Sequence, residues 1–286
     1  MRLGIEVELT GGAHDAISVL CDEGLAAAGH LHDYHCNCDC CEYDRPAQYA
    51  WTGQEDCTVD GELISRILTW GDDAWQAIAK LGNVLHEVRA EADPFGGGNY
   101  DAAGNHVHVE NVLDANGRRR LYRLFLRYGQ EGGDLELLAS AASRDMRGYN
   151  SRVEPEHLNP RVWRRNSPPD AAVATAEWVH AHRDGWEATR PANWHKHDAY
   201  HGTEGWLRCN AHRRTIEFRL WNATTLAWRL HMHAGLSVAM VKFADDPHSP
   251  VVTARTARPL LALLDPYMDA DTARYAQRQM AYATAA

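Results

Sequence analysis

Long apolar runs are the first thing that this sequence lacks. No segment approaches the roughly 18 uninterrupted apolar residues that a membrane-spanning helix needs, so we expect no transmembrane segment. The opening residues, MRLGIEVELT, also lack the apolar stretch of a secretory signal. We therefore expect a cytoplasmic protein whose seven cysteines stay reduced.

An excess of positive charge is missing as well. The chain has 29 Lys and Arg residues against 39 Asp and Glu residues, and its formal net charge is -10. We expect no dominant nucleic-acid surface, although the local run RVWRR could bind phosphate. The sequence has neither the phosphate-binding P-loop nor the glycine fingerprint of dinucleotide-binding folds, and FGGGN alone is weak evidence for nucleotide binding.

The composition that is present is that of an ordinary globular protein. Of the 286 residues, 45% are hydrophobic and 24% are charged, which is enough for a substantial core. Strand-like and helix-like segments follow one another without a βαβ rhythm, which favours the α+β class. We expect a single domain over residues 1–286, with a Cys/His-rich insertion at about 30–45 and a helical part from about 224.

Periodicity in the sequence predicts the individual elements. Alternation of apolar and polar residues predicts strands in the first ten residues, over 47–66, over 104–110, and in a pair around a turn at 211–213. A period near 3.6 predicts helices over 13–28, over 72–92, from 118, near 170–183, and through most of 224–286. Residues 146–170 are rich in Arg, Asn and Pro, and we expect a long functional loop there.

Three of the predicted strands carry paired polar residues two positions apart. Such residues point to the same face of a strand, so GNHVHVE would place two imidazoles side by side, with valines on the other face. The same spacing recurs in GIEVELT and TIEFRLW, and DGELIS adds a further carboxylate. If these strands join one sheet, its polar face carries Glu6, Glu8, Glu62, His106, His108, Glu217 and Arg219.

Each pair has a plainer explanation, which has to be compared with a metal site. Any half-solvated strand alternates in this way, and Glu217 and Arg219 could form ion pairs of small value. A solvated strand, however, has little reason to use His twice at this spacing. Because several carboxylates on one face repel one another unless cations lie between them, the combination favours a site for hard divalent cations such as Mg²⁺ or Mn²⁺.

Four motifs together resemble the putative amidoligase family, which is related to glutamine synthetase and glutamate–cysteine ligase. The segments GIEVEL, EDCTVDGELIS, GNHVHV and TIEFRLWNAT occur in the family's order and approximate spacing, and they span residues 4–225. The resemblance implies a glutamine-synthetase-like curved antiparallel sheet whose concave face binds Mg–ATP, with helices on its outer face. It also implies ATP-dependent joining of a carboxylate to an amine.

The resemblance also implies roles for single residues. Glu6, Glu8 and Glu62 look like metal ligands, His106 like the histidine ligand, and Glu217 like the metal-bridging glutamate. His108 and Arg219 resemble the groups that contact the transferring phosphoryl group. Asp56 matches the family's Asp before a small-residue turn, which we assign to catalysis, and Asn210 matches an Asn before the EFR strand, which we assign to nucleotide binding.

Two further sets of residues are candidates for binding. In HLHDYHCNCDCCEY, a tetrahedral zinc site could form from Cys36, Cys38 and Cys41 with either His35 or His32; the alternative is a Cys-rich loop without metal. Soft ligands at this density in a reducing compartment favour structural zinc. In the long loop, a substrate carboxylate could be bound by Arg144, Arg147 and Asn150.

The function that these residues predict is an ATP-dependent carboxylate–amine ligase that works through an acyl phosphate. Phosphoryl transfer needs mainly positioned cations and guanidinium groups, and the polar face could supply both. The substrates would be a small-molecule or peptide carboxylate and an amine. Two alternatives stay open: a metal-dependent nuclease or hydrolase that uses the same face, and a non-catalytic interaction protein stabilised by zinc. The absence of a Glu-x-Lys pair and the acidic net charge disfavour the nuclease.

Overall fold

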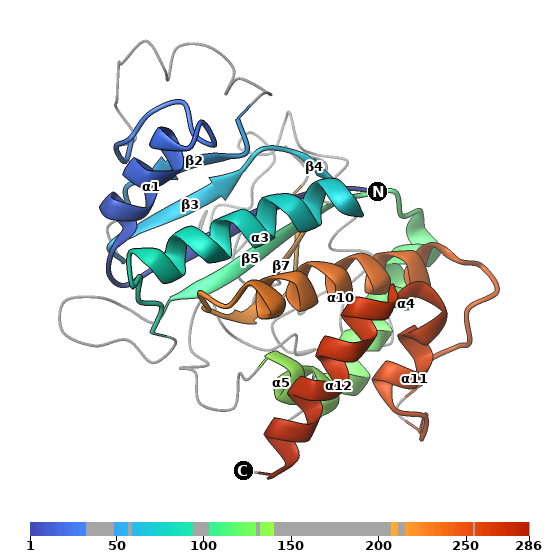
Figure 1. Ribbon diagram of the computed structural model, residues 1–286. Coiled ribbons are helices and arrows are strands. Elements are labelled where there is room, and N and C mark those ends of the chain that lie inside the picture. Colours follow the sequence, from blue (N-terminus) through green and yellow to red (C-terminus); the bar gives the residue numbers. More distant parts are fainter. Residues whose placement is uncertain are drawn as a thin grey trace, which may run out of the picture. The chain divides into compact units, whose positions relative to one another are not determined.

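Helices and antiparallel strands are mixed in this protein, as the α+β prediction requires (Figure 1). The computed structural model describes residues 1–32, 49–56, 59–93, 103–129, 132–139, 207–210, 215–253 and 255–285. Within these ranges the strands form one seven-stranded sheet in the order β2-β3-β1-β5-β7-β6, and β4 pairs with β1. The three strands with paired polar residues, β1, β5 and β7, are therefore consecutive neighbours.

The chain divides into two compact units, and each is described by itself. The first contains Met1–His108 and Trp221–Gly235, and the second contains the described residues of Val109–Leu220 and of Leu236–Ala286. The strands of the first unit are β1 (Arg2–Leu9), β2 (Trp51–Gln54), β3 (Gly61–Ser65), β4 (Leu68–Thr69) and most of β5 (Gly104–Glu110). Its helices are α1 (Ala13–Asp22), α3 (Asp72–Glu87) and the first part of α10 (Ala227–Asp245).

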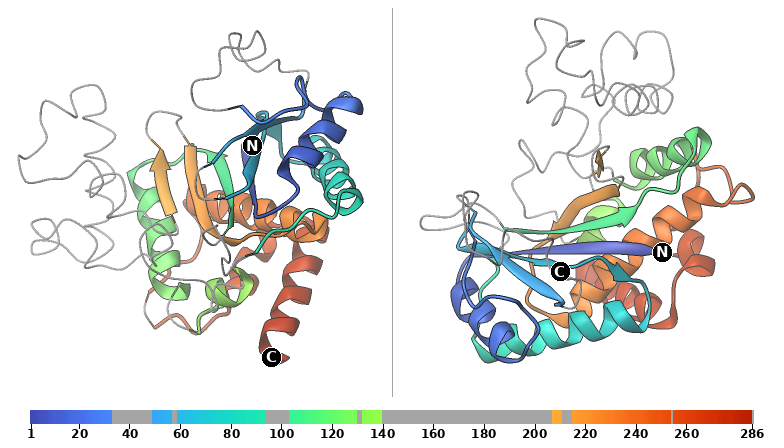
Figure 2. Two further views of the ribbon diagram at one scale, coloured as in Figure 1. Left: turned by 90° about the vertical axis from the view of Figure 1, so that its left-hand side faces the viewer. Right: turned by 90° about the horizontal axis from the view of Figure 1, so that it is seen from above.

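Strand β1 has one apolar face and one polar face, as its sequence predicts. Leu3, Ile5, Val7 and Leu9 are buried, while the residues between them are partly exposed. Figure 2 shows α1 and α3 on the same side of β1 and β3. On the apolar face of the sheet, a Cβ added to Gly53 would lie 2.9 Å from Ile17 Cγ1, so this strand residue has to be small for α1 to pack against it.

The register between neighbouring strands fixes which residues share a face. β1 and β3 are antiparallel, with Glu8 opposite Glu62 and Glu6 opposite Ile64. β2 is antiparallel to β3 on the far side, with Gln54 opposite Glu62. Because directly opposed residues point to the same side of a sheet, Glu6, Glu8 and Glu62 share one face.

Helix α1 is shorter than the predicted helix over 13–28, and that prediction is wrong at its C-terminal end. Gly24 adopts a left-handed conformation (φ 69°), and its N–H donates to the Cys21 carbonyl, which ends the helix. The apolar period continues through Leu25, but Ala26 instead forms a parallel bridge to Trp51. Helix α3 likewise ends at Glu87 rather than at residue 92.

Helix α3 also packs closely on the start of α10. A Cβ added to Gly82 would lie 2.6 Å from Cβ of Ala227. One turn further along α10, the ring of His231 packs against two tryptophans. Its centroid lies 5.0 Å from that of Trp70 and 4.8 Å from that of Trp75. This contact ties α10 to the N-terminal end of α3.

The second unit contains the remaining helices and strands. Its helices are α4 (Ala115–Tyr128), α5 (Asp134–Ala139), the end of α10, α11 (Leu260–Leu264), a 3-10 turn (Asp265–Tyr267) and α12 (Ala270–Ala285). Its strands are β6 (Leu207–Asn210) and most of β7 (Thr215–Asn222), paired antiparallel. The Phe125 and Phe218 rings pack at 6.0 Å, and α5 packs against α12.

Several other predictions can be compared with these elements. The region 47–66 does contain strands, the His strand over 104–110 and the strand pair are confirmed, and the part from 224 is mainly helical. The helix expected from 118 begins three residues earlier, because the Asp114 side chain accepts a hydrogen bond from Gly117 N–H at 2.6 Å and caps it. No helix in the described part of the chain is both long and apolar enough to cross a bilayer. The predicted loop over 146–170, the helix near 170–183 and the turn at 211–213 lie outside the described residues.

Candidate functional site

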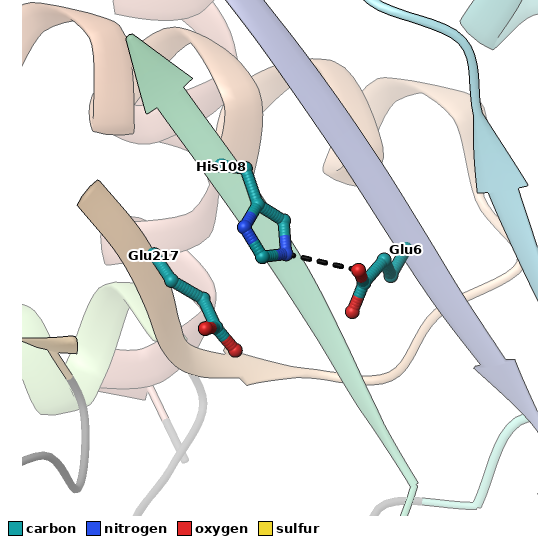
Figure 3. Close-up of side chains that lie close together, drawn as sticks. All are labelled: Glu6, His108 and Glu217. Carbon is teal, nitrogen blue, oxygen red and sulfur yellow. Dashed lines mark ion pairs between the residues drawn. The ribbon is translucent and has the colours of Figure 1, made fainter. Parts of the chain in front are cut away.

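Two carboxylates of β1 and two imidazoles of β5 meet on the polar face of the sheet. The alternation of each strand turns Glu6 and Glu8, and His106 and His108, to the same side as one another. The histidines are buried, with 4% and 6% exposure, whereas the glutamates are partly exposed. Figure 3 shows His108 and Glu6 pointing toward one another, joined by an ion pair of 3.0 Å between Nε2 and Oε1.

His106 lies between two carboxylates. Its Nδ1 is 3.1 Å from Glu6 Oε2, and its Nε2 is 3.4 Å from Glu8 Oε1. A neutral imidazole carries one N–H and one lone pair, so it can donate to only one of these carboxylates. The other nitrogen then faces a carboxylate oxygen with its lone pair, and this repulsion is relieved by a proton on the ring or on that carboxyl group, or by a metal ion between the two atoms.

Glu6 is the carboxylate that both imidazoles share. Burial alone would raise the pKa of Glu6, but hydrogen bonds and favourable charge interactions with His106 and His108 hold this pKa well below its usual value. Glu6 is therefore an anion at neutral pH, with each of its oxygens directed at a ring nitrogen. A carboxylate held ionised beside two imidazoles is a suitable ligand for a divalent metal ion.

Glu8 lies between β5 on one side of β1 and an acidic residue of β3 on the other side. Its Oε2 accepts a hydrogen bond from the Gly104 N–H at 2.5 Å, which orients the carboxylate. Across β1 and β3, Glu8 stands directly opposite Glu62, which is only 8% exposed. Like charges directly opposite one another destabilise an antiparallel pair, so this arrangement also favours a cation nearby.

Glu217 and Arg219 are paired with each other in the second unit. Arg219 donates from Nη1 to Glu217 Oε1 at 2.6 Å, and the Glu217 side chain is almost fully buried. The two residues lie on the same face of β7, as their spacing predicts, and the backbone of Arg208 is opposite Glu217 in β6. The pair holds one guanidinium group and one carboxylate in fixed positions on this strand.

The other predicted site residues fall into two groups. Asp56 lies two residues beyond the end of β2 and is partly buried, and Asn210 ends β6 opposite Thr215. His32 forms a parallel bridge to Gln54, and its ring lies 4.7 Å from that of His30. The remaining candidates lie outside the described residues: His35, Cys36, Cys38, Cys41, Arg144, Arg147 and Asn150.

One buried polar residue next to the site was not predicted from the sequence. Asn105 precedes His106 and is in phase with Val107 and Val109, so alternation assigns it to the apolar face of β5. It is fully buried there. The signal that could have revealed it is an amide at a position where the pattern demands an apolar side chain.

Comparison with known protein families bears directly on this arrangement. A sequence model of the family described as "Putative amidoligase enzyme" matches residues 1–241. The chain belongs to this family. The match covers all the strands and ends inside α10 of this amidoligase family member, so α11 and α12 lie beyond it. No curated protein sequence matches the chain.

Proposed function

We propose that this member of the amidoligase family is an ATP-dependent carboxylate–amine ligase that uses Mg²⁺ or Mn²⁺. The observation that carries the proposal is His106 between the carboxylates of Glu6 and Glu8. This arrangement lies within the matched range of a family described as an amidoligase enzyme. The proposal includes the finer features that the resemblance implies: a glutamine-synthetase-like curved sheet, a single domain over residues 1–286 and a cytoplasmic location.

The residues on this face fit a divalent cation. Carboxylate oxygens with an occasional imidazole nitrogen form the ligand set that Mg²⁺ and Mn²⁺ accept. Glu6 and His108 of the first unit and Glu217 of the second are the candidate ligands labelled in Figure 3. In the proposal these three residues, with His106, Glu8 and Glu62, hold the cations, and a bound cation would supply charge stabilisation for a transferring phosphoryl group.

The proposed reaction joins an acid to an amine in two steps. A carboxylate is a poor acceptor for an amine because its oxygen is a poor leaving group. In the first step a substrate carboxylate oxygen takes the γ-phosphoryl group, the bond to ADP breaks, and an acyl phosphate forms. In the second step the amine attacks the acyl carbon, phosphate leaves, and the amine loses a proton.

The protein residues have separate roles in this reaction. We assign Arg219 and His108 to the phosphoryl oxygens, because a guanidinium group already fixed by Glu217 loses little further freedom on binding. Asp56 is assigned to catalysis and Asn210 to the nucleotide. The substrate carboxylate is assigned to Arg144, Arg147 and Asn150. Structural zinc is assigned to His35, Cys36, Cys38 and Cys41.

Titration calorimetry with ATP tests the proposal. ATP and a non-hydrolysable analogue should both bind when Mg²⁺ or Mn²⁺ is present and should bind much more weakly in EDTA. Pairs of acids and amines can then be screened for ADP release. Failure of both nucleotides to bind with either metal would overturn the ligase assignment, and metal binding without nucleotide binding would favour the hydrolase alternative.

A further inference from the structure

The fully buried amide of Asn105 lies directly behind the histidines of the site. Asn105 and His106 are consecutive residues of a strand, so their side chains point to opposite faces of β5. The Asn105 side chain is on the face that also buries Val107 and Val109. Burying an amide among apolar groups costs stability unless its hydrogen bonds are replaced.

The contacts of Asn105 fix the orientation of its amide group. Its Nδ2 lies 3.3 Å from the carbonyl oxygen of Asn222 and 3.4 Å from Nδ1 of His233. The Asn222 carbonyl can only accept, so the amide nitrogen must be on that side. The amide nitrogen can only donate, and His233 Nδ1 must therefore accept with its lone pair, which places the ring proton on Nε2.

His233 is suited to remain such an acceptor. Burial, with a smaller contribution from the nearby Arg229 charge, lowers the pKa of His233 to about 3, so the ring stays neutral at physiological pH. The ring also stacks on Trp221, at 4.8 Å between centroids and 12° between planes. The acceptor atom is thus held in both protonation state and position.

Stability alone does not account for this amide. The Oδ1 atom of Asn105 is buried and has no hydrogen-bond partner among the described residues. A valine at this position would match Val107 and Val109 and would remove this unsatisfied carbonyl oxygen, but it would also remove the donor to the Asn222 carbonyl and to His233 Nδ1. The amide instead links β5 to the end of β7 and to α10 through directional contacts. This link is at the residue of β5 that precedes His106.

We propose that Asn105, with His233 as its acceptor, is a positioning residue: it fixes the segment of β5 that aims His106 and His108 at Glu6. The metal-related part of this inference rests on the proposed function, but the positioning of the imidazoles does not. A rotation of β5 at residue 105 moves both imidazoles together, because they share one face of the same short strand. Residues that orient metal ligands from behind typically change metal affinity by about 10–100-fold when they are replaced.

The first test uses the metal-free protein. Imidazole ¹⁵N NMR reports the protonation and hydrogen bonding of each ring nitrogen. We expect Asn105→Val and His233→Phe to shift the His106 and His108 ring signals, whereas Val107→Ala, on the same face of β5, should leave them in place even where it lowers the melting temperature more. Phe keeps an aromatic ring for the stack on Trp221 and lacks the acceptor, so His233→Phe decides the question if Asn105→Val does not fold. Unchanged ring signals in the folded variants would overturn the inference.

The second test measures Mn²⁺ binding by the same proteins. Both link variants should lose about tenfold or more in affinity, and Val107→Ala should stay within about twofold. Wild-type affinity in Asn105→Val and His233→Phe would contradict the positioning role. If the wild-type protein binds no Mn²⁺, the proposed function fails, and the NMR comparison alone decides whether Asn105 positions the imidazoles.

Discussion

Glu6 is the residue on which the candidate site depends most. Both imidazoles are directed at its two oxygens, and their interactions keep its pKa well below the usual value despite burial. Removing its charge therefore leaves His106 and His108 without their common partner. It also removes the desolvation cost of a largely buried carboxylate, so the two effects on folding oppose each other.

We expect Glu6→Gln to abolish metal binding without unfolding the protein. The amide keeps the shape of the side chain and loses the anionic oxygen that a hard cation requires. Mn²⁺ affinity should fall at least about 100-fold, which corresponds to roughly 2.7 kcal/mol, while the melting temperature changes by only a few degrees. The exposed Glu55→Gln, at the end of β2, is the matched control and should bind Mn²⁺ normally. Equal affinities in the two variants would show that Glu6 is not a ligand.

The sequence could reveal the four central side chains but not the amide behind them. Alternation alone predicts that Glu6 and Glu8 share a face and that His106 and His108 do too, because it depends only on neighbouring residues. Asn105 needs His233, which is 128 positions away. No local pattern contains that pairing, so only the folded chain explains why an amide stands in an apolar row.

At the scale of elements, the pairing of β1 with β3 makes a measurable prediction. Glu8 and Glu62 are directly opposite, and in the absence of a cation their charges repel. Glu62→Gln should therefore raise the stability of the metal-free protein by about 0.2–1 kcal/mol. In excess Mg²⁺ this gain should vanish or reverse, because the wild-type pair then has a cation to bind.

Denaturant unfolding with and without Mg²⁺ measures both effects in one protein. Glu55→Gln again serves as the control, because Glu55 is exposed, lies one residue beyond the end of β2 and is outside the paired register of β2 and β3. A gain in stability for Glu62→Gln that is the same with and without Mg²⁺ would mean that the Glu8–Glu62 pair binds no cation.

The elements themselves could be predicted to different degrees. The strands β1 and β5 and the helix α3 follow from periodicity, since apolar residues recur at the period of each element, with Asn105 as the exception in β5. The end of α1 does not, because the apolar period runs past Gly24 while the backbone leaves the helix there. The register between strands is also hidden from the sequence, because it depends on pairing between residues more than 50 positions apart.

At the scale of the whole molecule, the sheet brings together strands from distant parts of the sequence. β1, β5 and β7 are neighbours although they begin at Arg2, Gly104 and Thr215. The sequence analysis could state this only as a condition, that the strands with paired polar residues join one sheet. The strand order satisfies this condition, which supports a shared function for the pairs.

The dependence of stability on pH should show a contribution from His233. Its pKa is about 3 in the folded protein against 6.5 for an ordinary histidine. Below pH 6.5, His233 binds a proton in the unfolded chain but stays neutral in the folded protein. The free energy of unfolding therefore falls as the pH decreases from about 6.5 toward about 3. Glu6 acts in the same direction, but only below its ordinary pKa of 4.5, because its pKa in the folded protein is lowered too.

The window between pH 4.5 and pH 6.5 therefore separates the two residues. There we expect His233→Phe to flatten the pH profile of the free energy of unfolding by up to about 1.4 kcal/mol per pH unit, the slope for one proton. Glu6→Gln removes a carboxyl group whose own contribution to the profile lies below this window. Denaturant unfolding at half-unit steps of pH measures all three proteins, and imidazole ¹⁵N NMR of His106 and His108 at the same steps shows how much of each change in slope comes from those two rings rather than from His233. A wild-type slope in His233→Phe would mean that His233 takes up its proton in the folded protein, and the ring could then no longer serve as the acceptor of Asn105.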